Sequence, residues 1–410
     1  MTDLACPIQR SLPDIGYTRT DDDSIKTYDP YDLWALDLGV NVRRNYYEGK
    51  KTGKLRAITL GLLDWLFPLA SRRLLNCPRK LHPITAALLC LTEIKNGKNS
   101  GIPEFEEYWI GTFSELAAKQ GDPYWAWGLG FPWMSKNGLY GPDIPFVTHT
   151  PYVMEALSNF RNPRAVEMLD GTWKFLDNLI VMSDGDSELA LSYAPIHEPR
   201  IVVNANSYAA YAYALHAARG YAQQQSLDRS FKLANWILNN QNEDGLWWYY
   251  ADNLPGNFID CFHTCFVIKN LVKASSLIPE LQDMCRPAID RGRNAIRSSF
   301  IDAKSGLCRR FVVRDFKDPF VWDLYDQAEY LGLLIDFGHL DDASEFLGRI
   351  GNAFVAKGLI CARIDMFGRK WGTDFLRWGI APLHYQAARL RSALRSLPQA
   401  HPCTNNVHHA

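Results

Sequence analysis

The sequence lacks several features that would assign it to a common class of protein. Its 410 residues carry a net charge of −1, so the overall charge does not point to a nucleic acid or an anionic membrane, although local basic patches remain possible. The nine cysteines are odd in number and include no Cys-x-x-Cys pair, which argues against a disulfide framework. No apolar run is long enough to cross a membrane.

Signals for targeting and for cofactors are also missing. The N-terminus has no basic start followed by an apolar core, so it is not a secretory signal, and we expect a cytoplasmic protein. There is no phosphate-binding glycine loop, dinucleotide fingerprint or serine nucleophile elbow, so we expect chemistry without a cofactor. Cys261, His263 and Cys265 alternate with a period of two, which splays them apart on a helix, and we therefore expect no metal site.

Apolar and aromatic residues, by contrast, are plentiful. Hydrophobic residues make up 47% of the chain and charged residues 22%, a balance that allows a large buried core. The 13 tryptophans and 19 tyrosines combine a flat apolar face with a polar handle, which suits stacking on sugars or other rings. Large helical cores also use such residues, so their position decides between the two interpretations.

The hydrophobic pattern is helical, with almost no strand alternation. We expect a polar N-terminal arm over 1–27, one domain over 28–397 and a disordered tail over 398–410. Helices are predicted at 55–75 (broken at Pro68), 84–94, 105–118, 151–160, 165–180, 207–221, 230–240, 266–277, 284–300, 327–337, 343–356 and 380–397.

The connections between these helices alternate in length. Joints within a pair of helices are short, whereas the connections between pairs, such as 121–147 and 241–262, are long and rich in Gly, Trp and Asp. This alternation is typical of an all-α toroid of about six helical hairpins, with ligand-contacting loops gathered on one face. The uncharged run 207–215 predicts an enclosed inner helix. An open helical solenoid is the alternative.

Five polar clusters, spaced 51 to 63 residues apart, stand where helices following the long loops are predicted to begin. If alternate helices run in the same direction, all five clusters lie at one end of the fold and converge on one site. They are Thr148-His149-Thr150, Asn204-Ala205-Asn206, Asp260-Cys261-Phe262-His263-Thr264, Asp323-Leu324-Tyr325-Asp326 and Asp374-Phe375-Leu376-Arg377-Trp378.

Three of these residues are candidates for catalysis. A carboxylate beside a histidine can orient or charge the imidazole, so Asp260 and His263 can act as general acid or base. Asp260 and Asp323 can instead flank a glycosidic bond as a pair of carboxylates. The alternative is that each aspartate caps a helix and that His263 is a satisfied, partly buried side chain.

The remaining candidates are predicted to bind substrate. The amides of Asn204 and Asn206 match sugar hydroxyls, and Arg377 can hold a carboxylate while Trp378 stacks on a ring. An ion pair of Arg377 with Asp374 or Asp365 is the alternative. The aromatic loops 124–133 and 244–250 are also predicted to bind sugars. The other candidates are Trp125, Trp127, His149, Tyr193, Trp247, Trp248, Tyr325 and Asp326.

The order and spacing of several motifs resemble bacterial α/α-toroid proteins that are encoded with exopolysaccharide and capsule biosynthesis genes. Ser192-Tyr193-Ala194-Pro195 followed by Val203-Asn204 is more distantly similar to glucuronyl epimerases that invert carbon 5, although Ala205 stands where those enzymes have glycine. The motifs that carry the main resemblance are Tyr28-Asp29-Pro30-Tyr31-Asp32, Trp125-Ala126-Trp127-Gly128, His149-Thr150-Pro151, Leu191-Ser192-Tyr193-Ala194-Pro195, Asn204-Ala205-Asn206, Asp260-Cys261-Phe262-His263-Thr264 and Leu376-Arg377-Trp378-Gly379.

The resemblance implies a six-hairpin glycosidase-like fold and a role in making surface polysaccharide. Together with the site residues it favours an enzyme that cleaves a glycan containing uronic acid, by hydrolysis or β-elimination. The expected partner is an oligo- or polysaccharide, including one linked to a lipid. A uronate 5-epimerase and a non-catalytic glycan-binding scaffold are the alternatives.

Overall fold

The computed structural model describes residues 25–97, 101–121 and 123–397, in which six helices form a closed inner ring. Each inner helix packs against the next, and the last packs against the first. This ring confirms the all-α toroid predicted from the alternating connections. Its members are α5 (Pro83–Lys95), α7 (Thr150–Leu157), α9 (Val203–Ala218), α11 (Cys261–Leu277), α13 (Leu324–Asp336) and α15 (Ala381–Arg395).

An outer helix follows each of the first five inner helices and packs against it. The inner helix α9 is buried from Val203 to Ala217, as expected for the uncharged run in its sequence. Outer helices bury one face only; in α14, for example, Phe346 and Ile350 are buried whereas Asp341 and Asp342 are exposed. The outer helices are α6 (Pro103–Glu115), α8 (Pro163–Asp177), α10 (Gln223–Asn239), α12 (Glu280–Ser299) and α14 (Leu340–Phe354).

Side-chain caps help set where two inner helices begin. Asp260 is the N-cap of α11, with its Oδ1 accepting from the backbone N–H of His263 at 3.3 Å. Asp323 caps α13 in the same way, accepting from the N–H of Tyr325 at 2.9 Å. Carboxylates at this position satisfy backbone donors that have no partner within the helix. Both helices therefore start a few residues earlier than their apolar periodicity predicts. The helix α9 also starts earlier, at Val203, although its N-cap residue Val202 makes no side-chain cap.

Short strands line the long connections, although the sequence shows almost no alternation. Each strand has only two to four residues, too few for a period of two to be visible. The strands are β1 (Trp133–Ser135), β2 (Gly138–Tyr140), β3 (Val181–Asp184), β4 (Leu189–Leu191), β5 (Ile259–Asp260), β6 (Phe311–Val313), β7 (Phe320–Asp323), β8 (Val355–Ala356), β9 (Leu359–Ile360), β10 (Arg363–Asp365) and β11 (Lys370–Trp371).

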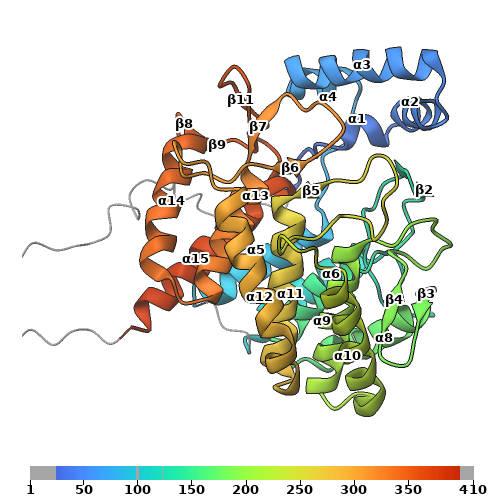
Figure 1. Ribbon diagram of the computed structural model, residues 1–410, viewed down its shortest axis with the longest axis vertical. Coiled ribbons are helices and arrows are strands. Elements are labelled where there is room, and N and C mark those ends of the chain that lie inside the picture. Colours follow the sequence, from blue (N-terminus) through green and yellow to red (C-terminus); the bar gives the residue numbers. More distant parts are fainter. Residues whose placement is uncertain (1–24, 98–100, 122, 398–410) are drawn as a thin grey trace, which may run out of the picture.

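Four N-terminal helices lie together at one end of the molecule, beside the strands β5, β6 and β7 (Figure 1). The predicted break at Pro68 separates the third from the fourth, whereas the first two were not predicted. Gly53 lets the second and third cross closely, because a Cβ there would lie 2.5 Å from the carbonyl carbon of Asn45. The four are α1 (Asp32–Ala35), α2 (Asp37–Tyr47), α3 (Lys51–Leu66) and α4 (Pro68–Leu74).

The predicted terminal segments fall mostly outside the described residues. This applies to 1–24 of the predicted arm and to the whole predicted tail, 398–410. The last residues of the predicted arm pack on the domain: Ile25 and Thr27 are buried, and the backbone of Thr27 pairs with that of Lys80.

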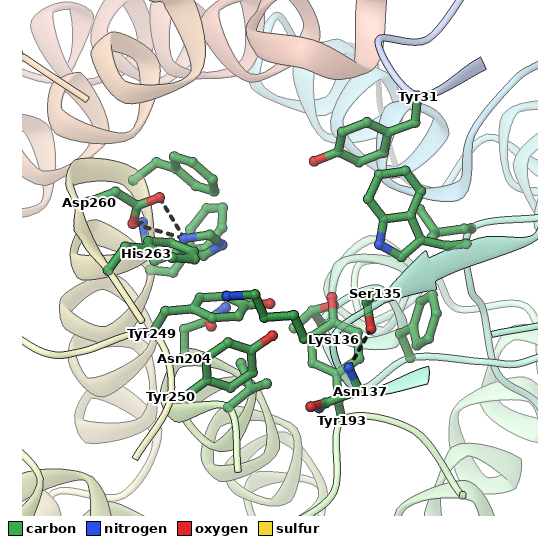
Figure 2. A pocket seen from close by; sticks show the side chains of 18 of the residues that line it. Tyr31, Ser135, Lys136, Asn137, Tyr193, Asn204, Tyr249, Tyr250, Asp260 and His263 are labelled. Atoms are coloured by element: carbon green, nitrogen blue, oxygen red, sulfur yellow. Dashed lines mark hydrogen bonds and ion pairs between the residues drawn. The ribbon is translucent and has the colours of Figure 1, made fainter. Parts of the chain in front are cut away.

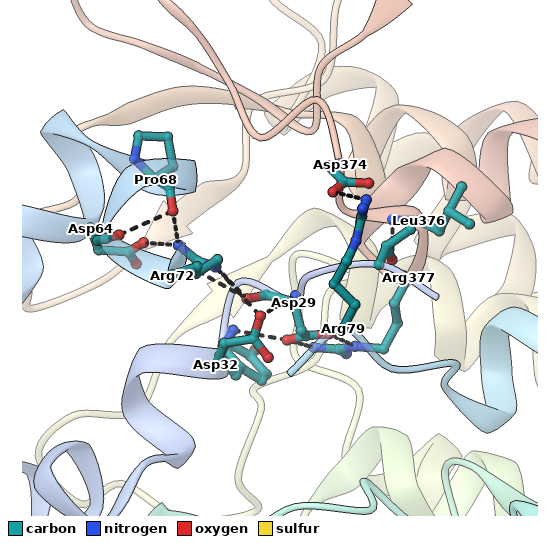
Figure 3. Close-up of polar contacts among 12 residues, drawn as sticks. Asp29, Asp32, Asp64, Pro68, Arg72, Arg79, Asp374, Leu376 and Arg377 are labelled. Atoms are coloured by element: carbon teal, nitrogen blue, oxygen red, sulfur yellow. Dashed lines mark hydrogen bonds and ion pairs between the residues drawn. The ribbon is translucent and has the colours of Figure 1, made fainter. Parts of the chain in front are cut away.

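A buried ion pair joins the N-terminal segment to the turn that precedes α15 (Figure 3). The Arg377 guanidinium donates to both carboxylate oxygens of Asp29, with Nη2 to Oδ1 at 2.7 Å. Arg72 donates to the carbonyl oxygen of Asp29 at 2.9 Å. The partners expected for Arg377 are engaged elsewhere: Asp374 pairs with Arg79, and Asp365 pairs with an arginine four residues further along the chain.

The chain enters α15 through an irregular turn at Leu376–Ile380. Gly379 in this turn has a φ of +91°, and a Cβ there would lie 2.8 Å from both Leu324 Cβ and the Tyr325 backbone nitrogen. Only glycine meets both requirements without strain. The turn places Arg377 and Trp378 next to the start of α13.

We expect Gly379→Ala to lower the free energy of unfolding by about 3 kcal/mol or more, because it adds a steric clash to the cost of a positive φ. Gly338→Ala is the matched control, since Gly338 also has a positive φ (+74°) but no atom within 4 Å of the added Cβ. That variant should lose only about 1–2 kcal/mol. Chemical denaturation of both variants measures the difference, and equal losses would contradict the packing described for this turn.

Candidate functional site

One cavity of about 640 Å³ occupies the end of the toroid at which all six inner helices begin. Residues from the first turn of each inner helix, or immediately before it, line this cavity. The geometry that the spacing predicts, in which distant polar clusters face a common space, is therefore present. The lining residues at these starts include Ile84, His149, Asn204, His263, Tyr325, Arg377 and Trp378.

Aromatic side chains from the N-terminal segment and from two long connections also line the cavity. Tyr31 stacks on Trp133, with ring centroids 4.1 Å apart and planes inclined by 28°. Tyr249 stacks on Phe258 at 4.7 Å, and Tyr249 also contacts the His263 ring. Flat faces arranged in this way can receive the apolar faces of sugar rings.

His263 and Asp260 form a dyad on the α11 side of the cavity, across from Tyr31 and Lys136 (Figure 2). The Nδ1 atom of His263 lies 2.8 Å from both carboxylate oxygens of Asp260, whose side chain is buried. A carboxylate that accepts from Nδ1–H fixes the tautomer and leaves Nε2 as the basic nitrogen. The arrangement can take a proton from a ligand in the cavity.

A second hydrogen-bonded group, formed by Thr148, His149 and Tyr193, also lines the cavity. The Thr148 hydroxyl donates to the Tyr193 hydroxyl at 2.8 Å and lies 3.0 Å from His149 Nδ1. Burial, with a smaller effect from Arg377, lowers the pKa of His149 to about 3, so its ring is neutral. Since the Tyr193 oxygen accepts from Thr148, its own proton is available for donation.

The two predicted amides have different roles. Asn204 lines the cavity, and its buried Oδ1 has no hydrogen-bond partner among the described residues. Asn206 does not reach the cavity, because its side chain accepts from the backbone of Leu191 at 2.7 Å and donates to the carbonyl of Val202 at 3.0 Å. Asn204 can therefore bind a ligand, whereas Asn206 attaches α9 to a neighbouring strand.

Asp323 lies behind the cavity wall and does not line it, which departs from its predicted catalytic role. Its carboxylate accepts from the guanidinium groups of Arg310 and Arg363 and from Trp378 Nε1, the last two at 2.8 Å. Burial acts to raise the pKa of Asp323, but Arg310 and Arg363 outweigh that effect and hold the pKa below its usual range. This carboxylate stays charged and positions Arg310 and Trp378, both of which do line the cavity.

Asp326 is also buried behind the wall. Its Oδ1 accepts from the N–H of Phe262 at 3.0 Å, while Oδ2 has no partner within the described ranges. Burial is the largest influence on this carboxyl and raises its pKa well above the usual range. Asp326 therefore holds the start of α11 in place and does not contact a ligand in the cavity.

Four of the five predicted tryptophans lie away from the cavity, Trp378 being the exception. Trp127 Nε1 donates to the carbonyl of Phe113 at 2.8 Å, and Trp247 Nε1 donates to that of Ile237 at 2.9 Å. Trp125 is buried in the same core, and Trp248 is partly buried against it. Hydrogen bonding to backbone carbonyls lets the indoles of Trp127 and Trp247 pack inside the domain. The loops that carry them reach the cavity through other aromatic residues, namely Trp133, Tyr249 and Tyr250.

Several cavity residues were not among the predicted ones. Tyr31, Arg43 and Tyr47 come from the N-terminal helices and the turn before them, and Lys136 from the β1–β2 turn. Arg310 precedes β6 and shows no motif in the sequence. For Lys136, the one available signal was Gly138, a turn residue that follows the aromatic loop 124–133.

The floor of the cavity is closed by side chains that connect four of the inner helices, α7, α9, α11 and α13. The hydroxyls of Tyr152 and Tyr208 are 2.9 Å apart. Below them, Lys269 Nζ donates to the Tyr152 hydroxyl at 3.1 Å and to Glu329 at 2.8 Å. All four side chains are buried, so this layer fills the axis of the ring.

Glu198 supports the cavity wall from behind. Its carboxyl accepts from the Tyr140 hydroxyl and from the N–H of Tyr193, both at 2.6 Å. Burial is the largest influence on this group and raises its pKa to about 7, although both hydrogen bonds act in the opposite direction. Glu198 therefore helps to place two tyrosines whose rings line the cavity.

The described part of the chain has neither a cluster of metal ligands nor a membrane-spanning helix. It contains no group of three or more His, Cys, Asp or Glu side chains arranged to hold a metal ion. None of its helices combines the length and apolar character needed to span a bilayer.

Comparisons with known proteins find structural similarity alone. No protein-family model and no curated protein matches the chain. A sugar epimerase from a ruminal bacterium has a TM-score of 0.56 at 12% identity, covering 77% of this chain and 88% of the epimerase. An α-mannanase from Bacteroides thetaiotaomicron has a TM-score of 0.51 at 13% identity, covering 77% of this chain and 87% of the mannanase. A polysaccharide lyase has a TM-score of 0.53 at 12% identity, covering 78% of this chain and 92% of the lyase. Identities this low show a shared fold only.

We expect the stability of the protein to fall as pH rises from about 5 to about 8, in part because of Glu198. Its folded pKa of about 7 lies above the ordinary 4.5, so its contribution is complete below pH 4.5 and is lost as pH rises through 7. Relative to Glu198→Gln, the wild type should lose about 1–3 kcal/mol of unfolding free energy over this range. The exposed Glu243→Gln is the control, and a pH dependence unchanged in Glu198→Gln would refute the assignment.

Proposed function

We propose that the protein is an enzyme that acts on a glycan containing uronic acid, beginning with removal of a proton by His263. The observation that carries the proposal is the His263–Asp260 dyad on the wall of an aromatic cavity. A context in surface-polysaccharide synthesis is supported by the sequence resemblance to capsule proteins.

Three features support a glycan as the substrate. The stacked rings around Tyr31 and Tyr249 suit sugar faces, and Asn204 offers an unpartnered amide oxygen to a hydroxyl. The cavity volume falls within the range of small-molecule sites. The structural neighbours named above, an epimerase, a mannanase and a lyase, are all described as enzymes acting on sugars.

Proton transfer fits the site better than hydrolysis by a carboxylate pair. Hydrolysis needs a second carboxyl group facing the bond at about 5–10 Å. Asp260 is engaged by His263, and Asp323 is enclosed by two arginines and an indole. Asp315 and Asp318 also line the cavity, and they make hydrolysis the second candidate.

In the proposed reaction, His263 Nε2 removes the proton at carbon 5 of a uronate, next to its carboxylate. Arg310, which lines the cavity close to Asp260, neutralises the charge that develops on that carboxylate. In β-elimination the bond from carbon 4 to its oxygen then breaks, a 4,5-double bond forms, and Tyr193 gives its proton to the leaving oxygen. In epimerisation Tyr193 would instead protonate the opposite face of carbon 5.

Incubation with a panel of uronic-acid-containing oligosaccharides tests the proposal. Absorbance from a 4,5-double bond indicates elimination, and solvent deuterium at carbon 5 without cleavage indicates epimerisation. Both outcomes support proton removal. New reducing ends without unsaturation would instead show hydrolysis, and binding with no reaction would support a scaffold; either result would overturn the proposal.

We expect His263→Gln to lower kcat about 10²–10⁴-fold on whichever oligosaccharide reacts, because the base is lost. Asp260→Asn should give a loss of similar size with little change in KM, since the imidazole then loses the partner that orients it. His339→Gln is the control, because His339 is exposed beside the outer helix α14. A His263→Gln variant that folds and retains full activity would contradict the assignment of the base.

A further inference from the structure

One side of α3 carries an exposed apolar stripe that no other part of the described chain covers. The residues Leu55, Ile58, Leu62 and Leu66 are spaced by three or four positions, so they form one face of the helix. Their exposed fractions range from 43% to 67%, in contrast to the buried Leu60 on the opposite side. We refer to these four residues as the α3 stripe.

Neighbouring aromatic residues extend the apolar surface beyond the helix. Phe67, which follows α3, is 56% exposed. Phe367, in the turn between β10 and β11, is 71% exposed and stacks on Trp65 of α3 with ring centroids 6.0 Å apart. Two segments about 300 residues apart in sequence thus contribute to one exposed apolar surface.

Cationic side chains border the stripe, and no carboxylate of α3 does. Lys51, Lys54 and Arg56 are exposed and make no ion pair within the described residues. On a helical projection Lys54 and Arg56 lie on opposite sides of the stripe. The sole acidic residue of α3, Asp64, faces inward and pairs with the buried Arg72 at 2.6 Å.

We propose that the α3 stripe docks on the surface of an anionic lipid bilayer. A helix with an apolar face bordered by lysine and arginine lies in the plane of the membrane interface, with its apolar side chains among the lipids and its cations at the headgroups. The near-neutral net charge of the whole chain does not oppose this, because attraction by the headgroups is local and acts within about a Debye length.

A second copy of the chain is a poorer occupant of the stripe. A symmetric dimer places the same surface on both partners. Lys54 and Arg56 of both copies would then border one interface to which α3 brings no carboxylate, and an excess of like charge opposes association.

Docking through α3 would bring the cavity beside the membrane. Three residues of α2 line the cavity, namely Arg43, Tyr46 and Tyr47. The helix α2 packs directly on α3. The four N-terminal helices lie at the same end of the molecule as the strands that border the cavity (Figure 1). A glycan carried on a membrane lipid is then the substrate class within reach; this last step rests on the proposed function, whereas docking itself does not.

Co-sedimentation of the full-length protein with vesicles tests the docking. We expect binding to vesicles of phosphatidylcholine with phosphatidylglycerol, weaker binding to phosphatidylcholine alone, and loss of binding at high salt. Ile58→Asp with Leu62→Asp should weaken binding at least about tenfold, and Lys51→Gln, Lys54→Gln and Arg56→Gln together should do the same for anionic vesicles.

The matched control carries Val181→Asp in β3 and Leu359→Asp in β9. These two apolar residues are 54% and 57% exposed, which is similar to Ile58 and Leu62, but they lie away from α3. It should sediment like the wild type, and thermal unfolding checks that every variant is folded. The proposal is overturned if the wild type does not bind anionic vesicles or if all variants bind equally. It is also overturned if light scattering shows a wild-type oligomer that the Ile58 and Leu62 variants dissociate. None of these measurements depends on enzymatic activity, so docking and the proposed function can fail separately.

Discussion

The buried carboxylate of Asp323 is the constraint on which the cavity wall depends. It caps α13, and its oxygens also hold two guanidinium groups and the indole nitrogen of Trp378. These partners come from β10, from the segment before β6 and from the turn before α15, so one side chain joins three connections to one helix start. A buried charge is tolerated only when it is paired and hydrogen-bonded in this way. The sequence suggests Asp323 as a catalytic acid, but in the structure this side chain orients Arg310 toward the cavity.

The fold and the position of the site could be predicted from the sequence to a large extent. Short joints alternating with long loops indicate paired helices, and the uncharged run around Ala210 identifies an inner helix that the structure shows to be buried. The convergence of polar clusters follows from the same alternation. What the sequence could not reveal was which side of each helix start faces the cavity. Asn204 and Asn206 differ by two positions, yet one faces the cavity and the other fastens a strand.

The aromatic loops illustrate the same limit. Trp127 and Trp133 lie in one glycine-containing loop, but the indole nitrogen of Trp127 is taken by a backbone carbonyl in the core, whereas Trp133 stacks beside the cavity. Local composition is the same for both, and only tertiary contacts separate them. The N-terminal contribution was missed for a related reason: Tyr31 becomes a cavity residue because Asp29 is bound by Arg377, a contact between residues 348 positions apart.

The closed floor of the cavity bears on how a polymer could be handled. Because Tyr152, Tyr208, Lys269 and Glu329 block the axis of the ring, a long chain cannot thread through the toroid from one end to the other. It must enter and leave by the same mouth, either inserting a terminus or lying across the opening as a bent segment. For the proposed glycan substrate, a blind site of this kind would favour release after each turnover over continuous sliding along the polymer.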